Sequence, residues 1–99
     1  MVKHIVLFKL KNEISAAEKQ AVALKFKEAI EALPAIIPFI GHVEVGVNIN
    51  PDEQWNIALY SEFKTLEEVK AYAVHPAHVA AAKLLADVKE SRACVDYEF

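Results

Sequence analysis

The sequence contains a single cysteine and no long apolar run, and each scarcity excludes a class of protein. Cys94 alone excludes an internal disulfide, which fits a reducing compartment. The apolar core of the first segment spans only residues 5–8, too short for the central region of a secretory signal. No stretch approaches the ~20 apolar residues that cross a bilayer. We therefore expect a cytoplasmic protein with no membrane partner.

Positive charge is also scarce. The chain has 11 lysines and arginines against 14 acidic residues, for a net charge of −3. The lysines of the first third are scattered along the chain and form no basic cluster. Binding to nucleic acid depends on many basic side chains gathered on one surface. The composition therefore excludes nucleic acid as an expected partner.

Apolar residues, in contrast, are abundant and make up 55% of the 99 residues. A chain of this length is typical of one domain, which we place over residues 1–99. Such a domain buries only roughly 60–65% of its unfolded surface. Much apolar area would stay exposed in a monomer, and large exposed apolar patches usually mark interfaces. The composition therefore predicts a homodimer.

The order of the secondary-structure elements can be read from periodicity and capping signals. Two-residue alternation predicts strands over residues 2–10, 41–48, 55–63 and 92–98. Ser15 with Glu18, and Thr65 with Glu68, form capping boxes that predict the starts of two helices. The first helix should end at about Leu33, before a proline. The order is that of an α+β, ferredoxin-like βαββαβ subunit, with an antiparallel four-stranded sheet and both helices on one face.

Each strand has an apolar face, which we expect to lie beneath the helices, and an opposite face of mixed apolar and polar residues. The predicted helix-covered face consists of Ile5, Leu7, Val43, Val45, Val47, Ile57, Leu59, Ala93, Val95 and Tyr97. The opposite face is too apolar for water and too polar for a dry core, and we expect the same face of a second subunit to cover it. Two such sheets would form a dimeric α/β barrel whose interior holds a small ligand. This mixed face consists of His4, Val6, Phe8, His42, Glu44, Asn56, Tyr60, Cys94 and Asp96.

The densest chemistry lies in residues 72–79, where one phenol and two imidazoles surround a proline inside an apolar helical run. Pro76 must bend or restart the helix, which would place His75 at the new N-cap. Tyr72 would then close one helical piece and His78 would open the next. Their side chains are predicted to converge on one cavity.

Two interpretations of this pair remain open. In the first, His78 is a general base and Tyr72 orients a carbonyl oxygen of a substrate. In the second, Tyr72 packs with a bonded hydroxyl and His78 only caps or lines the helix. The choice is the same for His4, which is either a bonded interior histidine or a catalytic one.

No metal site is predicted. His75, His78 and an acid such as Asp96 could supply ligands, but two histidines across a proline lack the i, i+4 helical spacing of common metal motifs. Cys94 has no basic neighbour in the sequence, so a reactive thiol has little support. We expect no cofactor.

Four segments carry a resemblance that extends over essentially the whole chain: Val2–Leu10, Ile37–Ile40, His75–His78 and Asp96–Tyr97. With these segments the chain resembles the stress-responsive dimeric α/β-barrel (Dabb) family. The resemblance implies a homodimer whose two sheets form a central barrel. It also implies similarity to a plant polyketide cyclase of this family, in which a histidine and a tyrosine matching His78 and Tyr72 act as general base and substrate-positioning group for an aldol closure. A third match is His4.

Two functions follow as predictions. The first is a homodimeric Dabb protein that binds a small apolar or aromatic molecule in an internal cavity. The alternative is a cofactor-free enzyme, a polyketide-cyclase-like lyase or, by analogy of fold alone, a monooxygenase. It would use His78 as base and Tyr72 as the positioning group. The predicted pocket wall in either case is His4, Val6, Phe8, Asn56 and Tyr60.

Overall fold

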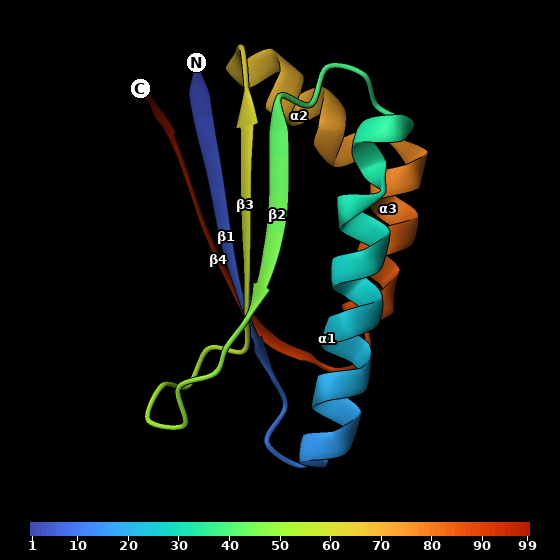
Figure 1. The fold of residues 1–99 in the computed structure, drawn as a ribbon, viewed down its shortest axis with the longest axis vertical. Helices are drawn as coiled ribbons and strands as arrows, with labels where there is room; N and C mark the ends of the chain where they lie inside the picture. The colour runs from blue at the N-terminus through green and yellow to red at the C-terminus, as the bar shows by residue number, and fades with distance from the viewer.

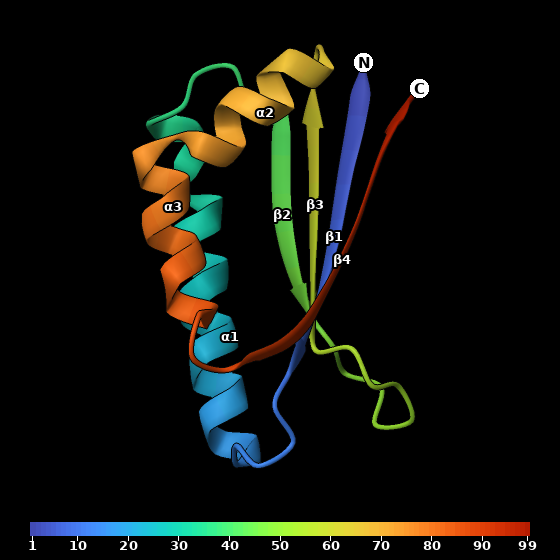
Figure 2. The ribbon, with the colours of Figure 1, turned by 180° about the vertical axis from the view of Figure 1, so that it is seen from behind.

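The computed structural model describes residues 1–99 and contains one antiparallel four-stranded sheet with all helices on one side (Figure 1). The sheet order is β2-β3-β1-β4. The first and last strands of the chain therefore pair with each other, with β1 inside the sheet and β4 at its edge. Both termini lie at the same end of the sheet in Figures 1 and 2. The strands are β1 (Val2–Leu10), β2 (His42–Val47), β3 (Ile57–Phe63) and β4 (Lys89–Glu98). This confirms the predicted ferredoxin-like βαββαβ fold.

The helices begin where the capping boxes predict. In α1 (Ala16–Glu31) the Ser15 hydroxyl accepts from the Glu18 amide, and in α2 (Leu66–Val74) the Thr65 hydroxyl accepts from the Glu68 amide. The helix after the Pro76 break is α3 (Pro76–Ala82). The 3₁₀ turns η1 (Leu33–Ala35) and η2 (Lys83–Leu85) follow α1 and α3. None of these helices combines the length and the apolar character that a membrane-spanning helix needs.

The prediction of which sheet face lies beneath the helices is right for β2 and β3 and wrong for β1 and β4. In register, Val6 lies beside Leu59, and Leu59 lies beside Val45, so these three share the helix-covered face. His4 and Phe8 share that face because they alternate with Ile5 and Leu7 along the strand. Burial agrees, since the buried residues of β1 are Val2, His4, Val6 and Leu10.

The open face of the sheet, on the side away from the helices, therefore has a different composition from the predicted one. Residues paired with Ile5 and Leu7 lie on it, including Tyr60 on one side and Val95 on the other. Several of its apolar side chains are exposed, and Val95 is 53% exposed. We define the open face by Lys3, Ile5, Leu7, Lys9, His42, Glu44, Ala58, Tyr60, Glu62, Ala93, Val95 and Tyr97.

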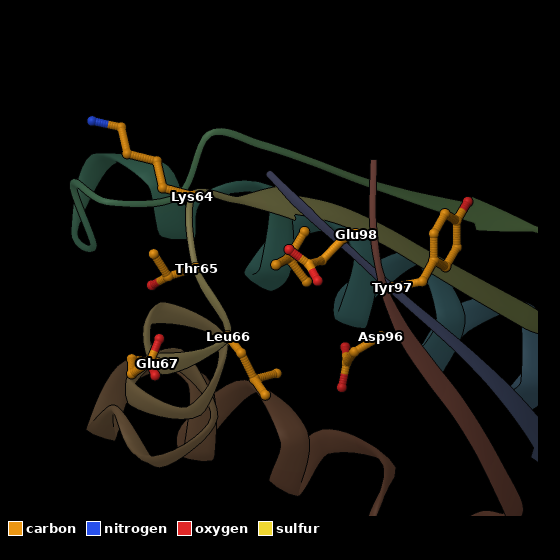
Figure 3. Close-up of a pocket in the computed structure, with 8 residues that line it drawn as sticks. Lys64, Thr65, Leu66, Glu67, Asp96, Tyr97 and Glu98 are labelled. Atoms are coloured by element: carbon orange, nitrogen blue, oxygen red, sulfur yellow. The ribbon is translucent and has the colours of Figure 1, made fainter.

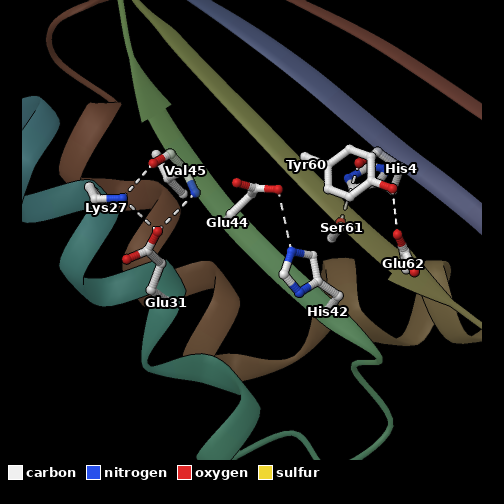
Figure 4. A network of polar contacts seen from close by, with 9 residues as sticks. All are labelled: His4, Lys27, Glu31, His42, Glu44, Val45, Tyr60, Ser61 and Glu62. Carbon is white, nitrogen blue, oxygen red and sulfur yellow. Dashed lines mark hydrogen bonds and ion pairs between the residues drawn. The ribbon is translucent and has the colours of Figure 1, made fainter.

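One polar network ties α1 to the edge strand β2 (Figure 4). The Lys27 ammonium donates to the Val45 carbonyl at 2.7 Å and to the Glu31 carboxylate at 2.7 Å. The same carboxylate accepts from the Val45 amide at 3.0 Å. Both backbone groups of Val45 on this edge thus have partners, which fixes α1 over the sheet. These bonds lower the pKa of Glu31, with Lys27 as the largest cause.

Candidate functional site

The break between α2 and α3 is built by one histidine and one proline. His75 has extended backbone angles, and its Nδ1 accepts a hydrogen bond from the Ala77 amide at 3.1 Å. Pro76 occupies the first turn of α3, where its missing N–H costs nothing. His75 is therefore the N-cap of α3, as predicted. The break turns His78 back toward α2 and the sheet.

His78 is held as a neutral imidazole with one free nitrogen. Its Nδ1 lies 3.1 Å from the carbonyl oxygen of Ala73, and since a carbonyl only accepts, Nδ1 carries the proton. Burial lowers the pKa of His78, although the bond to Ala73 opposes that shift and the nearby His4 adds to it. The Nε2 atom of neutral His78 therefore presents a lone pair.

Tyr72 lies directly beside this histidine and is fully buried. The two ring centroids are 4.3 Å apart, and the Tyr72 ring also packs against Phe63 at 5.1 Å. The Tyr72 hydroxyl is the one buried side-chain polar atom without a hydrogen-bond partner. Burial raises the pKa of Tyr72, so the hydroxyl remains a neutral donor. An unpaired buried hydroxyl is unusual in a folded protein.

His4 enters the same region from the sheet. Its Nδ1 lies 2.5 Å from Oδ1 of Asp96, the residue directly opposite it on β4. Its ring centroid is 6.1 Å from that of Tyr72. His4 is buried, being 7% exposed, while the Asp96 side chain is 31% exposed. The carboxylate orients the ring and places the proton on Nδ1.

His4 and His78 border a cavity between the sheet and the helices. Tyr72 packs against both histidines but is not one of the wall residues, so its predicted place at the cavity is not found. The cavity measures about 100 Å³. Apolar side chains form most of its wall, the two histidines contribute polar groups, and the exposed cations Lys89 and Arg92 lie on its solvent side. The wall consists of His4, Val6, Phe8, Phe26, Leu59, Ala73, His78, Ala82, Leu85, Lys89 and Arg92.

The structure thus places three of the predicted pocket residues at one cavity with His78, but the other two lie elsewhere. Tyr60 lies on the open face, where its hydroxyl donates to Glu62, a bond that raises its pKa to about 12. Asn56 accepts from the Leu10 amide at 2.7 Å and fixes the end of β1. The cavity therefore lies beneath the helices of a single subunit and not between two sheets.

Sequence reasoning missed several wall residues, chiefly Phe26, Leu85 and Arg92. Phe26 and Leu85 appear in the sequence as ordinary core positions of helical segments, and nothing in their spacing separates a cavity wall from a filled core. Arg92 could have been found from strand register, because it lies opposite Phe8 on β4 and so shares its face. The error in the predicted faces of β1 and β4 concealed this.

A second, open hollow of about 620 Å³ reaches Asp96 from outside (Figure 3). It lies between the start of β1, the end of β4 and the start of α2. In Figure 3 the side chains of Asp96 and Leu66 point into the space between β4 and α2. The Asp96 carboxylate thus contacts both solvent and the buried His4. The hollow is lined by Val2, Lys64, Thr65, Leu66, Glu67, Asp96, Tyr97 and Glu98.

The fold and this arrangement define a ferredoxin-like α+β protein with a small, histidine-lined cavity. The family model of the Stress responsive A/B Barrel Domain matches residues 2–99. The chain therefore belongs to the stress-responsive A/B barrel (Dabb) family.

Relatives of this chain include a dimeric protein and an enzyme. A dimeric protein of unknown function from Bacteroides fragilis, with a ferredoxin-like fold, is 66% identical, with a TM-score of 0.98 over 99% of this chain and 95% of that one. Olivetolic acid cyclase from Cannabis sativa is 29% identical over 97% of this chain and 94% of its own length. A dimeric ferredoxin-like protein of unknown function from Thermobifida fusca, 23% identical, has a TM-score of 0.80 over 99% of this chain and 90% of that one.

Proposed function

We propose that this protein is a homodimer that binds a small apolar or aromatic carbonyl compound in the cavity beneath α2 and α3. The dimer is supported by the exposed apolar side chains of the open face and by the dimeric relative at 66% identity. Because the cavity lies on the helix side, each subunit carries its own binding site.

The size and lining of the cavity define the ligand. A dry engineered cavity of about 150 Å³ holds benzene, so about 100 Å³ admits only a smaller group or one part of a larger molecule. The apolar wall suits a hydrocarbon part, and the two histidines suit a carbonyl or hydroxyl oxygen. A longer molecule would extend past Lys89 and Arg92, where an acidic group would find positive charge.

The observation that carries this proposal is the Tyr72 hydroxyl, which is buried without a partner. Leaving such a group unpaired costs about 1–3 kcal/mol. Tyr72 is not itself a wall residue, but its ring packs directly against the wall residues His78 and His4. A ligand oxygen that reached its hydroxyl past these side chains would recover that cost, whereas a purely structural tyrosine would be expected to have a bonded hydroxyl.

The test is native mass spectrometry of the protein purified from its own host, in search of a retained small molecule. The measurement is repeated with Tyr72→Phe and His78→Ala, and with Tyr60→Phe as a matched control on the open face. We expect retention by the parent protein and the control, and its loss from the two cavity variants. Unchanged retention in both cavity variants would exclude this site.

A second candidate function is general-base catalysis, and the bond from His78 to Ala73 favours it. That bond fixes the Nδ1–H tautomer, so the basic Nε2 is free to take a proton. In the proposed step Nε2 removes a proton from the carbon next to a carbonyl. The C–H bond breaks, its electron pair forms a C=C bond as the carbonyl π pair moves to the oxygen, and the Tyr72 hydroxyl donates to the resulting enolate. In an aldol closure, the enolate carbon then bonds to a second carbonyl carbon, whose oxygen takes the proton.

The first half of this reaction can be tested without knowledge of the substrate. Acetone and acetophenone in D₂O exchange their α-protons when a base abstracts them, and NMR follows the exchange. We expect the protein to accelerate exchange, His78→Gln to abolish the acceleration, and His42→Gln on the open face to preserve it. Equal rates with the parent protein and with His78→Gln would exclude His78 as the base.

A further inference from the structure

A cluster of three possible metal ligands lies at the edge of the cavity. His4 Nδ1 is 2.5 Å from Asp96 Oδ1 and 3.6 Å from Cys94 Sγ. The imidazole, thiol and carboxylate ligand atoms all lie within 4.8 Å of one another. The register of the sheet explains the convergence, because Asp96 lies directly opposite His4 and Cys94 is two residues away on the same face of β4.

The arrangement does not suit a nucleophilic cysteine. In a Cys-His-Asp relay the thiol and the carboxylate engage opposite ring nitrogens, so that the imidazole carries a proton between them. Here both engage the same atom, His4 Nδ1. Burial and the Asp96 charge also raise the pKa of Cys94, whereas a nucleophilic thiol needs a lowered one. Three different ligand types aimed at one point instead resemble a coordination site.

We propose that His4, Cys94 and Asp96 bind one divalent zinc ion per subunit, with a fourth, open position taken by water. Imidazole, thiolate and carboxylate are the ligands that zinc prefers, and three protein ligands with water is a known pattern of coordination. Tetrahedral bonds of ~2.0–2.3 Å place ligand atoms roughly 3.3–3.8 Å apart. The contact between Cys94 and His4 already has that span, and the contact between His4 and Asp96 must lengthen by about 1 Å.

The surroundings supply an entry path, and they place one ring with an unpartnered hydroxyl beside His4. The hollow in Figure 3 reaches Asp96 from solvent, so an ion need not cross the core. When Nδ1 bonds to zinc, the ring proton of neutral His4 moves to Nε2, which then needs an acceptor. The unpartnered hydroxyl of Tyr72 belongs to a ring 6.1 Å from that of His4. Metal-bound histidines usually have such a second partner.

Proton balance gives one direct readout. On binding, the S–H bond of Cys94 breaks, the sulfur bonds to zinc, and the thiol proton passes to the buffer. The His4 proton only moves between its two nitrogens, and Asp96 exchanges its hydrogen bond for a metal bond. Calorimetry in buffers of different ionisation enthalpy should therefore show about one proton released per ion. The expected release is close to zero for Cys94→Ser, because that variant has no thiol to ionise.

The test uses protein without a histidine tag, titrated with Co²⁺ as a spectroscopic substitute for zinc and then with Zn²⁺ in competition. We expect one Co²⁺ per chain, a sulfur-to-metal charge-transfer band, and displacement by one Zn²⁺. Cys94→Ser should lose the band, and both Cys94→Ser and Asp96→Asn should weaken binding at least about tenfold. Both substitutions are at exposed positions, so the fold should persist and is checked by circular dichroism.

A matched control is His42→Gln, which removes another histidine and carboxylate pair, His42 with Glu44 at 3.3 Å, on the open face. This variant should bind the metal like the parent protein. Absence of the charge-transfer band from the parent protein, or a band unchanged in Cys94→Ser, would overturn the proposal. So would weaker binding by His42→Gln, because it would place the ion at the other face. None of these readouts requires ligand binding or catalysis at His78.

Discussion

The rings of Tyr72 and His78 pack across the junction of α2 and α3 with their centroids 4.3 Å apart and their planes tilted by 52°. Only one of the two rings has a hydrogen-bond partner for its polar atoms. His78 has a backbone partner in Ala73, and Tyr72 has none. The packing that holds both rings therefore fixes the histidine tautomer while leaving a buried donor unpaired. This combination is consistent with the proposed binding of a ligand whose oxygen atom accepts a hydrogen bond from Tyr72.

Removal of that donor should stabilise the ligand-free protein. In Tyr72→Phe the ring packing is retained and the cost of an unpaired buried hydroxyl disappears, so we expect the free energy of unfolding to rise by about 1–2 kcal/mol. Urea denaturation of the two proteins measures the difference. Tyr60→Phe is the control and should give no such gain, because the Tyr60 hydroxyl is bonded to Glu62. A loss of stability in Tyr72→Phe would mean that an ordered water pairs with the hydroxyl.

The stability of the protein should also fall on mild acidification because of His78. Burial lowers its pKa below the ordinary value of 6.5, so the unfolded chain takes up a proton at a higher pH than the folded one. The stabilising contribution is present above pH 6.5 and is lost as the pH falls toward the folded-state pKa. Thermal unfolding between neutral pH and about 5 should show this decline. The decline should be shallower in His78→Gln, and His42→Gln should behave like the parent. Equal slopes in all three proteins would contradict it.

The network between α1 and β2 provides a third prediction, at lower pH. Glu31→Ala leaves the Val45 amide and the Lys27 ammonium without their shared acceptor, so we expect a loss of about 1 kcal/mol, discounted because the Lys27 and Glu31 side chains are more than one third exposed. Glu28→Ala, at an exposed position of the same helix, is the control. Because the pKa of Glu31 is lowered, its contribution disappears as the pH falls below 4.5. Urea midpoints above and below that pH measure both effects.

The sequence was sufficient to predict the element order, the N-cap residues Ser15 and Thr65 and the helix restart at His75, because each depends on neighbours within a few residues. The returning bond from the glutamate carboxylate to the N-cap amide, which completes a capping box, is not formed in either helix. The faces of β1 were not predicted correctly, since Ile5 and Leu7 are as apolar as Val6 and Phe8 and alternation alone does not choose between them. Lys3 and Lys9 flank the open side of β1 and were the usable signal.

The faces of β4 were predicted wrongly for a different reason. Its polar set points to the helix side because β4 is an edge strand, which leaves Arg92 and Cys94 exposed, and because Asp96 pairs with His4. In a strand that alternates apolar and polar residues, the apolar set is normally expected to face the core and the polar set the solvent. In β4 the polar set faces the helices instead, so that expectation gives the wrong face. Only the long-range register between β1 and β4 shows that Cys94 and Asp96 converge on His4.

The proposed dimer rests on the open face and can be disrupted there. Val95 is 53% exposed in the isolated subunit and lies beside Ile5 on the open face. A second subunit placed on this face would bury an aspartate introduced by Val95→Asp, and a buried unpaired carboxylate is costly. We expect light scattering to show the parent as two subunits and Val95→Asp as one. Val79→Asp, at a 39% exposed position of α3 on the helix side, is the control and should stay dimeric. A monomeric parent protein would contradict the dimer. A dimer that survives in Val95→Asp would instead place the interface on another surface.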